Sequence, residues 1–556
     1  MKKKILLFIC LVTVASLSFA QEITQDWSSS LGELRGKDNI AAKDLVHIDA
    51  NGNTYVYGSF SEYFTIGNTE LEPIGNSAYL AKLDNTGKVE WAVALQGNVT
   101  PAYMTTDAEG NLYLTGGSDG ESVILQSTDG TSKKLTGNDH ALWSQDANTL
   151  LAKYDTNGIL KEGKIFLHDN SGYTNEVLPM GLTLNNGSIY LALNIIGETT
   201  IDGSKFSGTT ATISESTTAI GVTHILSFDN STLNLQKEIA SITPENAIDD
   251  WSISSFAMTS NENNTYIAFI APAKQKVMAG TSSFNTDFNY EYNEADEWYE
   301  YQRGICVFKI NAEGNIDIHK SFQSENKVRL WAFGYETIDQ ILIKEDSWII
   351  AGNYNGKFVF NEEAPATSTY SSAPYFTLLN KNTADSQKSY FWEEGNVLNY
   401  AAAGNALILC STNSTNETST LKAYDFGTQN VTDLTTTEAG TSINGVASTG
   451  AKVAISKATA GAEVATLTVS MNTLSGLSGI NSSSVNTIDV KVYPNPVTDV
   501  LNFSEVCDVT ITNIQGSEIK VASTTTQIAV ADLAAGYYVA KIKTSNGIAV
   551  IPFIKK

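Results

Sequence analysis

The chain has 556 residues, 42% of them hydrophobic and 17% charged, so it can bury large cores but is too long for one ordinary domain. Acidic residues outnumber basic residues by 60 to 35, and the formal net charge is −25. Because nucleic-acid affinity comes mostly from Lys and Arg side chains that neutralise phosphates, this charge argues against nucleic-acid partners.

The first twenty residues have the pattern of a secretory signal peptide. Three lysines precede an apolar run from Ile5 to Val14, and small residues end at Ala20, directly before Gln21. The run is shorter than the ~20 apolar residues that a membrane-spanning helix needs, and no later stretch reaches that length. We therefore expect residues 1–20 to be cleaved off between Ala20 and Gln21, and we expect no transmembrane segment in the mature protein.

A two-part pattern recurs from Asp44 to about Met471. Its first part joins two apolar strands by a tight turn, as in HIDANGNTYVYGSF from His47 and TTDAEGNLYLTGG from Thr105. Its second part is another hairpin, as in YLAKLDNTGKVEWAVALQG from Tyr79. Apolar and polar residues alternate along the strands, so each copy predicts four strands of a half-buried sheet. Four-stranded units in tandem are typical of β-propeller blades, and the pattern predicts seven of them.

We predict an all-β chain with a seven-bladed β-propeller over residues 21–471. The last repeat has three convincing strands, and the segment around Trp27 resembles the fourth strand around Trp91. An N-terminal strand that completes the last blade would close the ring and remove an open sheet edge. Residues 472–487 are rich in Ser, Asn and Gly and predict a flexible linker. Residues 488–556 then predict a small β-sandwich of seven short strands.

The C-terminal region carries several motifs in order: Tyr493-Pro494-Asn495-Pro496, a turn that ends at Gly516, the run Gly536-Tyr537, and the basic end Lys555-Lys556. It closely resembles the type A sorting domain of proteins that the type IX secretion system exports. The resemblance implies an immunoglobulin-like domain that the outer-membrane translocon recognises and its sortase removes. It also implies a protein that is secreted or attached to the outer cell surface. The repeat region is similar, less closely, to bacterial β-propeller repeats that are common in such cargo.

The DxxGN turns, Asp49 to Asn53 and Asp107 to Asn111, have two interpretations. Closely spaced Asp and Asn oxygens suit Ca²⁺, but the distal bidentate glutamate of an EF-hand is missing. Asp and Asn also begin tight turns through hydrogen bonds to the backbone, and Gly takes the positive φ that such turns need. We favour the turn interpretation. Because the five histidines are also dispersed, we predict no metal site and no cofactor, with calcium as the open alternative.

One insertion is a candidate ligand-binding loop. The segment from Asn285 to Arg303 lengthens the connection between the second and third strands of the fourth repeat, and it combines aromatic rings with carboxylates. Such rings can stack on sugars or peptides, while carboxylates bind hydroxyls or cations. The alternative is a solvated loop whose rings fold back onto the blade. The predicted ligand-binding residues are Tyr290, Tyr292, Glu294, Asp296, Glu297, Trp298 and Tyr299.

The sequence has no recognisable catalytic motif, since it lacks a GxSxG elbow, a Walker loop and a GxGxxG segment after a strand. We therefore predict no catalytic residue and favour a secreted or surface-displayed propeller that binds an extracellular glycan or protein. Two alternatives stay open. One is a polysaccharide hydrolase or lyase that uses paired acids from different blades, and the other is a structural or adhesion protein of the cell surface.

Overall fold

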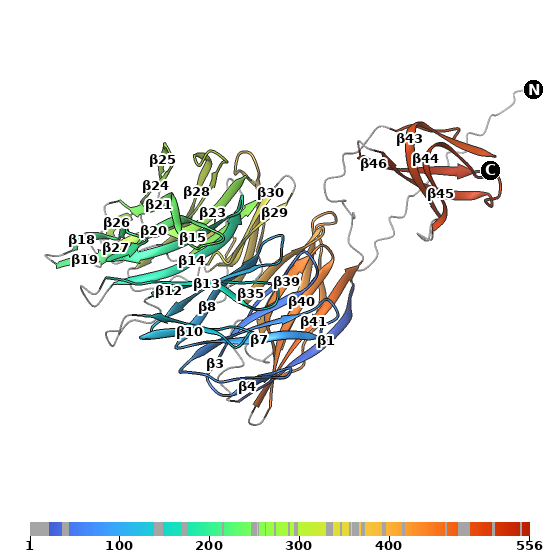
Figure 1. The fold of residues 1–556 in the computed structure, drawn as a ribbon. Coiled ribbons are helices and arrows are strands. Elements are labelled where there is room, and N and C mark those ends of the chain that lie inside the picture. Colours follow the sequence, from blue (N-terminus) through green and yellow to red (C-terminus); the bar gives the residue numbers. More distant parts are fainter. Residues whose placement is uncertain are drawn as a thin grey trace, which may run out of the picture. The chain divides into compact units, whose positions relative to one another are not determined.

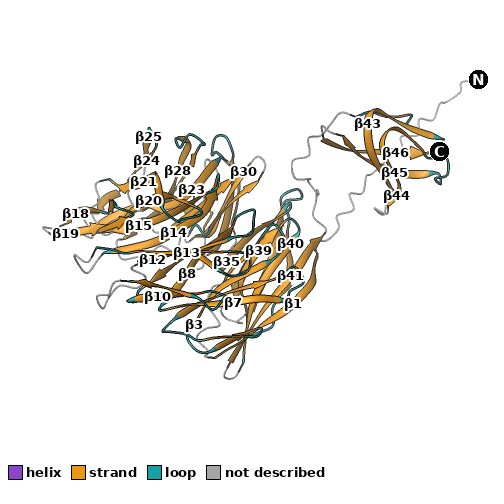
Figure 2. Ribbon diagram, viewed as in Figure 1, coloured by secondary structure: helices purple, strands orange, loops and turns teal. Residues whose placement is uncertain are grey.

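Two units, Met1–Gly479 and Ile480–Lys556, divide the chain in the computed structural model. Every regular element in the described residues is a β-strand (Figure 2), so the all-β prediction is confirmed for this part of the chain. The described residues are 22–35, 44–137, 148–169, 175–213, 216–245, 253, 255–261, 263–271, 274–286, 290–293, 298–329, 337–344, 347–354, 357–358, 366–367, 373–391, 396–413, 418–461, 464–475, 490–513, 518–544 and 547–556.

In the described part of the N-terminal unit, the strands group into seven antiparallel meanders of four strands each, which we number in chain order (Figure 1). Their strands are β2 (Leu45–Ile48), β3 (Thr54–Phe60), β6 (Ser77–Leu83) and β7 (Val89–Gln96) in meander 1; β8 (Val99–Thr106), β9 (Leu112–Ser118), β12 (Asn148–Tyr154) and β13 (Leu160–Phe166) in meander 2; β14 (Glu176–Asn185), β15 (Ser188–Ile196), β20 (Val222–Asp229) and β21 (Leu235–Pro244) in meander 3; β22 (Ser255–Asn261), β23 (Asn264–Ala271), β27 (Trp298–Ile310) and β28 (Ile316–Arg329) in meander 4; β29 (Gln340–Lys344), β30 (Ser347–Tyr354), β33 (Ala373–Asn380) and β34 (Ser386–Phe391) in meander 5; β35 (Asn396–Ala403), β36 (Ala406–Asn413), β37 (Thr418–Asp425) and β38 (Val431–Thr436) in meander 6; and β39 (Thr441–Thr449), β40 (Lys452–Ala460), β41 (Val464–Ser475) and β1 (Glu22–Arg35) in meander 7.

The core of the N-terminal unit consists of hydrophobic clusters between neighbouring meanders. Such a cluster occupies each successive boundary, including the one between meanders 7 and 1, where Leu467 and Val469 pack with Phe60. The first strand of each meander also contacts the first strand of the next, and β39 contacts β2. The meanders therefore follow one another around a closed circuit.

Strand β3 shows how the sequence produces this packing. Tyr55 and Tyr57 belong to the cluster shared with meander 2, whereas Val56 and Phe60 belong to the cluster shared with meander 7. Alternate side chains thus point to opposite neighbours, as the two-residue period of a strand requires. Every residue of β3 except Ser59 is buried. The prediction of a half-buried sheet is therefore wrong for this strand, because neighbouring meanders cover both of its faces.

The N-terminal strand completes the last meander. β1 pairs antiparallel with β41, with Trp27 opposite Met471, and Figure 1 shows the dark blue β1 beside the orange β41. This is the fourth-strand position expected for the segment around Trp27. β41 continues to Ser475, so the linker prediction is wrong for residues 472–475, whose backbone groups pair with β1 and β40. The rest of the predicted linker, 476–487, lies outside the described residues.

Inserted hairpins cover the outer edges of several meanders. Five of them, all in connections between the second and third strands of a meander, reach the last strand of the preceding meander. β10 pairs with β7, β24 with β21 and β31 with β28, while β4 contacts β1 and β16 contacts β13. A covered last strand offers no free edge to another chain. The inserted strands are β4 (Phe64–Ile66), β5 (Thr69–Leu71), β10 (Ser122–Gln126), β11 (Ser132–Thr136), β16 (Glu198–Ile201), β17 (Ser204–Ser207), β18 (Thr209–Ile213), β19 (Ser216–Ile220), β24 (Gln275–Ala279), β25 (Ser282–Asn285), β26 (Tyr290–Asn293), β31 (Lys357–Phe358) and β32 (Ala366–Thr367).

The described part of the C-terminal unit contains five strands in one sheet, in the order β42-β43-β45-β46 with β44 against β43. We predicted seven short strands for this region, and the structure has five. The number is smaller because β43 and β44 each span two of the predicted strands. Register shifts on either side of Cys507 let β43 stay paired across the polar stretch before it. The strands are β42 (Val492–Tyr493), β43 (Val500–Asn513), β44 (Glu518–Ala529), β45 (Gly536–Thr544) and β46 (Gly547–Lys555).

Candidate functional sites

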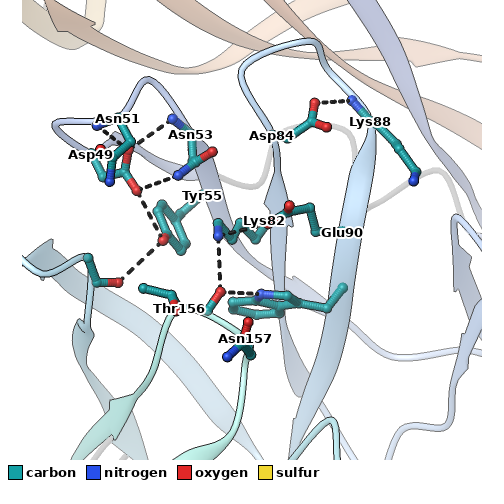
Figure 3. A network of polar contacts seen from close by, with 12 residues as sticks. Asp49, Asn51, Asn53, Tyr55, Lys82, Asp84, Lys88, Glu90, Thr156 and Asn157 are labelled. Carbon is teal, nitrogen blue, oxygen red and sulfur yellow. Dashed lines mark hydrogen bonds and ion pairs between the residues drawn. The ribbon is translucent and has the colours of Figure 1, made fainter.

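The DxxGN turns bind their own backbone (Figure 3). One oxygen of Asp49 accepts hydrogen bonds from the backbone N–H groups of Asn51 and Asn53, each at 2.9 Å. The other oxygen accepts from the Asn53 side-chain amide at 2.8 Å and from the Tyr55 hydroxyl at 3.3 Å. Asp107 repeats this arrangement in meander 2. Both oxygens of Asp49 thus have donors from their own turn, which is the structural role that we favoured for this motif.

A lysine in the second hairpin of the repeat connects neighbouring meanders. The buried Lys82 ammonium on β6 donates to the Thr156 carbonyl of meander 2 at 3.0 Å, and the Trp91 indole N–H donates to the same carbonyl at 3.1 Å (Figure 3). One meander further on, Lys153 donates to the Asn230 carbonyl at 2.8 Å. The most regular residues of the repeat therefore hold turns and meander boundaries together.

The insertion in meander 4 forms a backbone hairpin. β26 pairs with β27 so that Tyr292 lies opposite Tyr299 and Tyr290 opposite Tyr301, and Trp298 begins β27. Four of the seven predicted ligand-binding residues thus share one hairpin, although they are up to nine positions apart in sequence. The three predicted acids, Glu294, Asp296 and Glu297, lie outside the described residues.

A cavity of about 450 Å³ lies where the first strands of the meanders converge. Residues of β2, β8, β22, β29, β35 and β39 line it, and sequence reasoning missed it because no single repeat contains more than one of these strands. Among the described lining residues, none is Asp or Glu.

Burial shifts the pKa of three titratable side chains that line this cavity, His47, Tyr103 and Tyr400. His47 contacts the Thr106 hydroxyl through Nε2 at 2.8 Å, and burial lowers the pKa of His47 to about 4, so its imidazole is neutral at physiological pH. Burial, together with the charge of Asp339, raises the pKa of Tyr103 to about 12. A neutral imidazole and a neutral phenol can exchange hydrogen bonds with a ligand but carry no charge.

The predicted sorting residues converge at one edge of the C-terminal sheet. The Asn495 side-chain carbonyl accepts a hydrogen bond from the Ile554 backbone N–H at 2.9 Å. The Val497 N–H donates to the Ile554 carbonyl at 2.8 Å, and the Lys556 N–H donates to the Val497 carbonyl at 2.9 Å. The Pro motif, which includes Pro494 and Pro496, is thus tied to the end of the chain, which follows it by about sixty residues.

The other sorting residues lie beside this tie. Gly536 pairs with Lys555 and Tyr537 with Ile554 across β45 and β46. Tyr493 and Tyr537 are 52% and 67% exposed. Gly516, and the predicted cleavage site at Ala20 and Gln21, lie outside the described residues.

Comparison with known proteins identifies the C-terminal unit. Residues 491–556 match the family described as the secretion system C-terminal sorting domain. No curated protein matches the chain.

Several solved structures resemble the chain at a distance. The Dos1 propeller is 11% identical with a TM-score of 0.38, over 81% of this chain and 95% of that one. The polysaccharide lyase Uly1 is 8% identical with a TM-score of 0.40, over 81% and 99%. BamB from Moraxella catarrhalis is 8% identical with a TM-score of 0.31, over 80% and 97%. The architecture rests on the chain's own strand pairing and not on these likenesses.

The family match and the converging motifs agree on the role of the C-terminal unit. Within the described residues there is no helix of the length and apolar character that a membrane crossing requires. Residues 491–556 are a C-terminal sorting domain of the type IX secretion system, and the protein is accordingly exported, to be secreted or attached to the cell surface.

Proposed function

We propose that residues 22–475 form a seven-bladed β-propeller that binds an extracellular glycan or protein, and that the sorting domain, an immunoglobulin-like sandwich, directs its export. The main support for this proposal is that the meanders form a closed circuit. Each boundary between meanders has its own cluster, and β1 joins the last meander from the opposite end of the repeat region. A ring closed in this way has no open inner edge and presents a central cavity, which is where propellers and other closed β-folds commonly bind ligands.

The cavity supports binding better than hydrolysis. Paired carboxylic acids are the usual catalysts of glycoside cleavage, and the described residues that line this cavity include none. We therefore propose binding as the function, and we keep as part of this proposal the expectation of no catalytic residue and no cofactor. Two alternatives remain open, a polysaccharide hydrolase or lyase and a purely structural surface protein. A binding screen must distinguish both of them from a binding protein.

Export would use both ends of the precursor. Residues 1–20 would direct the chain across the inner membrane and be removed at Ala20 and Gln21. The translocon would then recognise the edge formed by the Pro motif and the chain end, and its sortase would release or anchor the propeller. The supporting observation is that motifs from both ends of the sorting domain share this edge.

A binding screen tests the proposed function. Mature protein is applied to a glycan array and to extracellular matrix proteins, with and without calcium, beside a Trp298→Ala/Tyr299→Ala variant. Met278→Ala, which removes an exposed apolar side chain from β24, is the control. We expect calcium-independent binding in the wild type and in Met278→Ala, and weaker binding in the double variant if the meander 4 hairpin contributes.

Three results would contradict parts of this proposal. Cleavage products released from a bound glycan would favour the hydrolase or lyase. Absence of any glycan or protein ligand would favour the structural role. Binding that requires calcium would overturn the absence of a cofactor.

A further inference from the structure

A second cavity, of about 720 Å³, opens where the last meander meets the first. Its walls come from β1 and β41 on one side and from the connection between β3 and β6 on the other, segments that lie up to ~400 positions apart in the chain. Gly32, Glu33, Ser61, Glu62, Tyr63 and Pro73 are among its lining residues. Its volume lies within the range of small-molecule sites. We call it the closure cleft.

The close approach of β1 and β4 forms the floor of the closure cleft. Gly32 has a φ of +136°, and a Cβ atom placed there would stand only 2.2 Å from the Thr65 carbonyl oxygen. Any other residue at this position would therefore force the two strands apart. The cleft is built by specific backbone geometry, and it exists because β1 closes the ring.

An exposed aromatic ring forms part of the cleft wall. Tyr63 is 58% exposed, and its hydroxyl donates to the Glu72 carboxylate at 2.9 Å, which restrains the ring. Ile74, directly after the lining residue Pro73, is 50% exposed. Among the described residues of the N-terminal unit, no large apolar side chain is more exposed than these two. Of these two, Tyr63 lines the cleft, and an exposed aromatic ring at a concave surface indicates a binding site.

The polar groups of the closure cleft define what it can bind. Glu33 and Glu62 offer carboxylate oxygens that accept hydrogen bonds, and the Ser61 and Thr65 hydroxyls can donate or accept. These carboxylates would repel uronic acids, sulfated sugars and phosphates. The flat face of the Tyr63 ring suits the apolar face of a sugar ring.

We propose that the closure cleft binds a neutral saccharide, with Tyr63 stacked on a sugar ring and Glu33 and Glu62 accepting hydrogen bonds from its hydroxyl groups. This inference rests on the proposed binding function and gives it a ligand class and a site distinct from the meander 4 hairpin. A cationic peptide could also bind to two carboxylates and a tyrosine. Binding of such a peptide is the alternative outcome of the test. The two differ in charge, because ion pairs at an exposed site weaken with salt whereas hydrogen bonds to neutral hydroxyls do not.

The test measures affinity by calorimetry for cello-, xylo- and manno-oligosaccharides, with alginate oligosaccharides and oligolysine as contrasting probes. The proteins are the mature wild type, Tyr63→Ala, Tyr63→Phe and Glu62→Gln. Glu121→Gln, which removes an exposed acid outside the cleft, is the matched control. We expect at least one neutral probe to bind wild type and control equally, to bind Tyr63→Ala at least tenfold more weakly, and to keep most of its affinity for Tyr63→Phe.

Hydrogen exchange locates the bound saccharide independently of the variants. We expect saccharide-dependent protection in residues 61–73 and none in residues 298–303. If a neutral saccharide binds with unchanged affinity to Tyr63→Ala and Glu62→Gln, or protects only the meander 4 hairpin, the cleft assignment is wrong while the proposed binding function stands. Salt-sensitive binding of oligolysine alone, or no binding of any neutral probe, would overturn the ligand class.

Discussion

The two units of the chain use their apolar side chains in opposite ways. In the N-terminal unit, the largest fully buried side chains, such as Trp348 and Tyr57, lie in clusters between meanders. The C-terminal unit has one core cluster, yet it contributes six of the ten exposed large apolar side chains found in the described residues: Tyr493, Val500, Val506, Ile519, Val521 and Tyr537. Apolar side chains stabilise the first unit, whereas many in the second are available to a partner.

This difference fits the two tasks. A displayed ring must remain folded outside the cell, and hairpins of the same chain pair with the outer edges of three of its meanders. A sorting domain must be recognised by the export machinery, so it has to leave groups accessible. We therefore expect substitutions in the first unit to change stability, and substitutions of exposed residues in the second to change export.

Removal of β1 should have the largest effect on the ring. Deletion of residues 22–35 leaves β41 paired with β40 alone, exposes its other edge, and removes Leu31 from the cluster between meanders 7 and 1. We expect the variant to lose its cooperative thermal transition and to aggregate, as followed by circular dichroism and size-exclusion chromatography. A synthetic peptide of residues 22–35 added in trans should restore the transition. A deletion variant that melts like wild type would show that β1 does not close the ring.

A pair of aromatic substitutions tests the contrast between the units directly. Trp348→Ala removes a fully buried ring and the hydrogen bond from its indole N–H to the Asn380 carbonyl, and it should cost about 3–5 kcal/mol of unfolding free energy. Tyr537→Ala, at a side chain that is 67% exposed, should change stability by less than ~0.5 kcal/mol but reduce the amount of exported protein. Denaturation in urea and cell fractionation measure the two effects. Normal export of Tyr537→Ala would remove this residue from the recognised surface.

A buried carboxyl links the first and last meanders and should make the stability of the ring depend on pH. Asp44 is 3% exposed and accepts hydrogen bonds from the Tyr79 hydroxyl on β6 at 3.1 Å and from the Ser456 hydroxyl on β40 at 2.6 Å. Burial raises the pKa of Asp44 from 3.8 to about 6, against the opposite effect of both hydrogen bonds. Between these values the folded protein binds more protons than the unfolded chain. The stabilisation is therefore complete below the unfolded pKa and is lost as the pH rises through about 6.

Asp44→Asn removes this titration. The unfolding free energy of wild type relative to the variant should fall by on the order of 3 kcal/mol between pH 4 and pH 7. Urea denaturation at a series of pH values measures this difference. Glu121→Gln removes an exposed acid and serves as the control, with an expected change below ~0.5 kcal/mol. A constant difference between wild type and Asp44→Asn over this range would exclude Asp44 as the source of the pH dependence.

Much of the architecture could be predicted from the sequence because it depends on local chemistry. The DxxGN turns fix the ends of strands within a few residues of themselves, as the hydrogen bonds of Asp49 illustrate. The number of times that the pattern recurs along the chain then predicts the number of repeats. The sorting motifs were recognisable for a different reason. Their order along the chain is specific in itself, so the family resemblance did not depend on knowing that the motifs lie close together in the fold.

The closure cleft and the Asp44 cluster could not be predicted, because each forms where residues that are far apart in the sequence come together across the ring. The closure cleft needs Gly32 and Tyr63 side by side, and the Asp44 cluster needs Ser456, more than four hundred residues away. Nothing in the local pattern marks these residues. The predicted linker failed at residues 472–475 for the same reason, because its Ser- and Asn-rich sequence becomes a strand only beside β1.

The smallest expected effect lies at the boundary between meanders 1 and 2. Lys82 is 6% exposed, and its ammonium also contacts Glu90 at 2.7 Å. Lys82→Met should cost only about 1 kcal/mol, because the Thr156 carbonyl keeps its hydrogen bond from Trp91. Exposed Lys88→Met is the control, with an expected change below ~0.5 kcal/mol.

A double-mutant cycle shows whether the two donors support each other. Trp91→Phe alone leaves Lys82 on the carbonyl, but Lys82→Met with Trp91→Phe leaves the Thr156 carbonyl without either donor. The double variant should therefore lose up to about 1 kcal/mol more than the sum of the single losses, since a partly buried carbonyl without a donor carries part of its desolvation cost. Strict additivity would mean that water replaces the missing donors, and that the regular lysine of the repeat matters for packing along its aliphatic stem and not for its hydrogen bond.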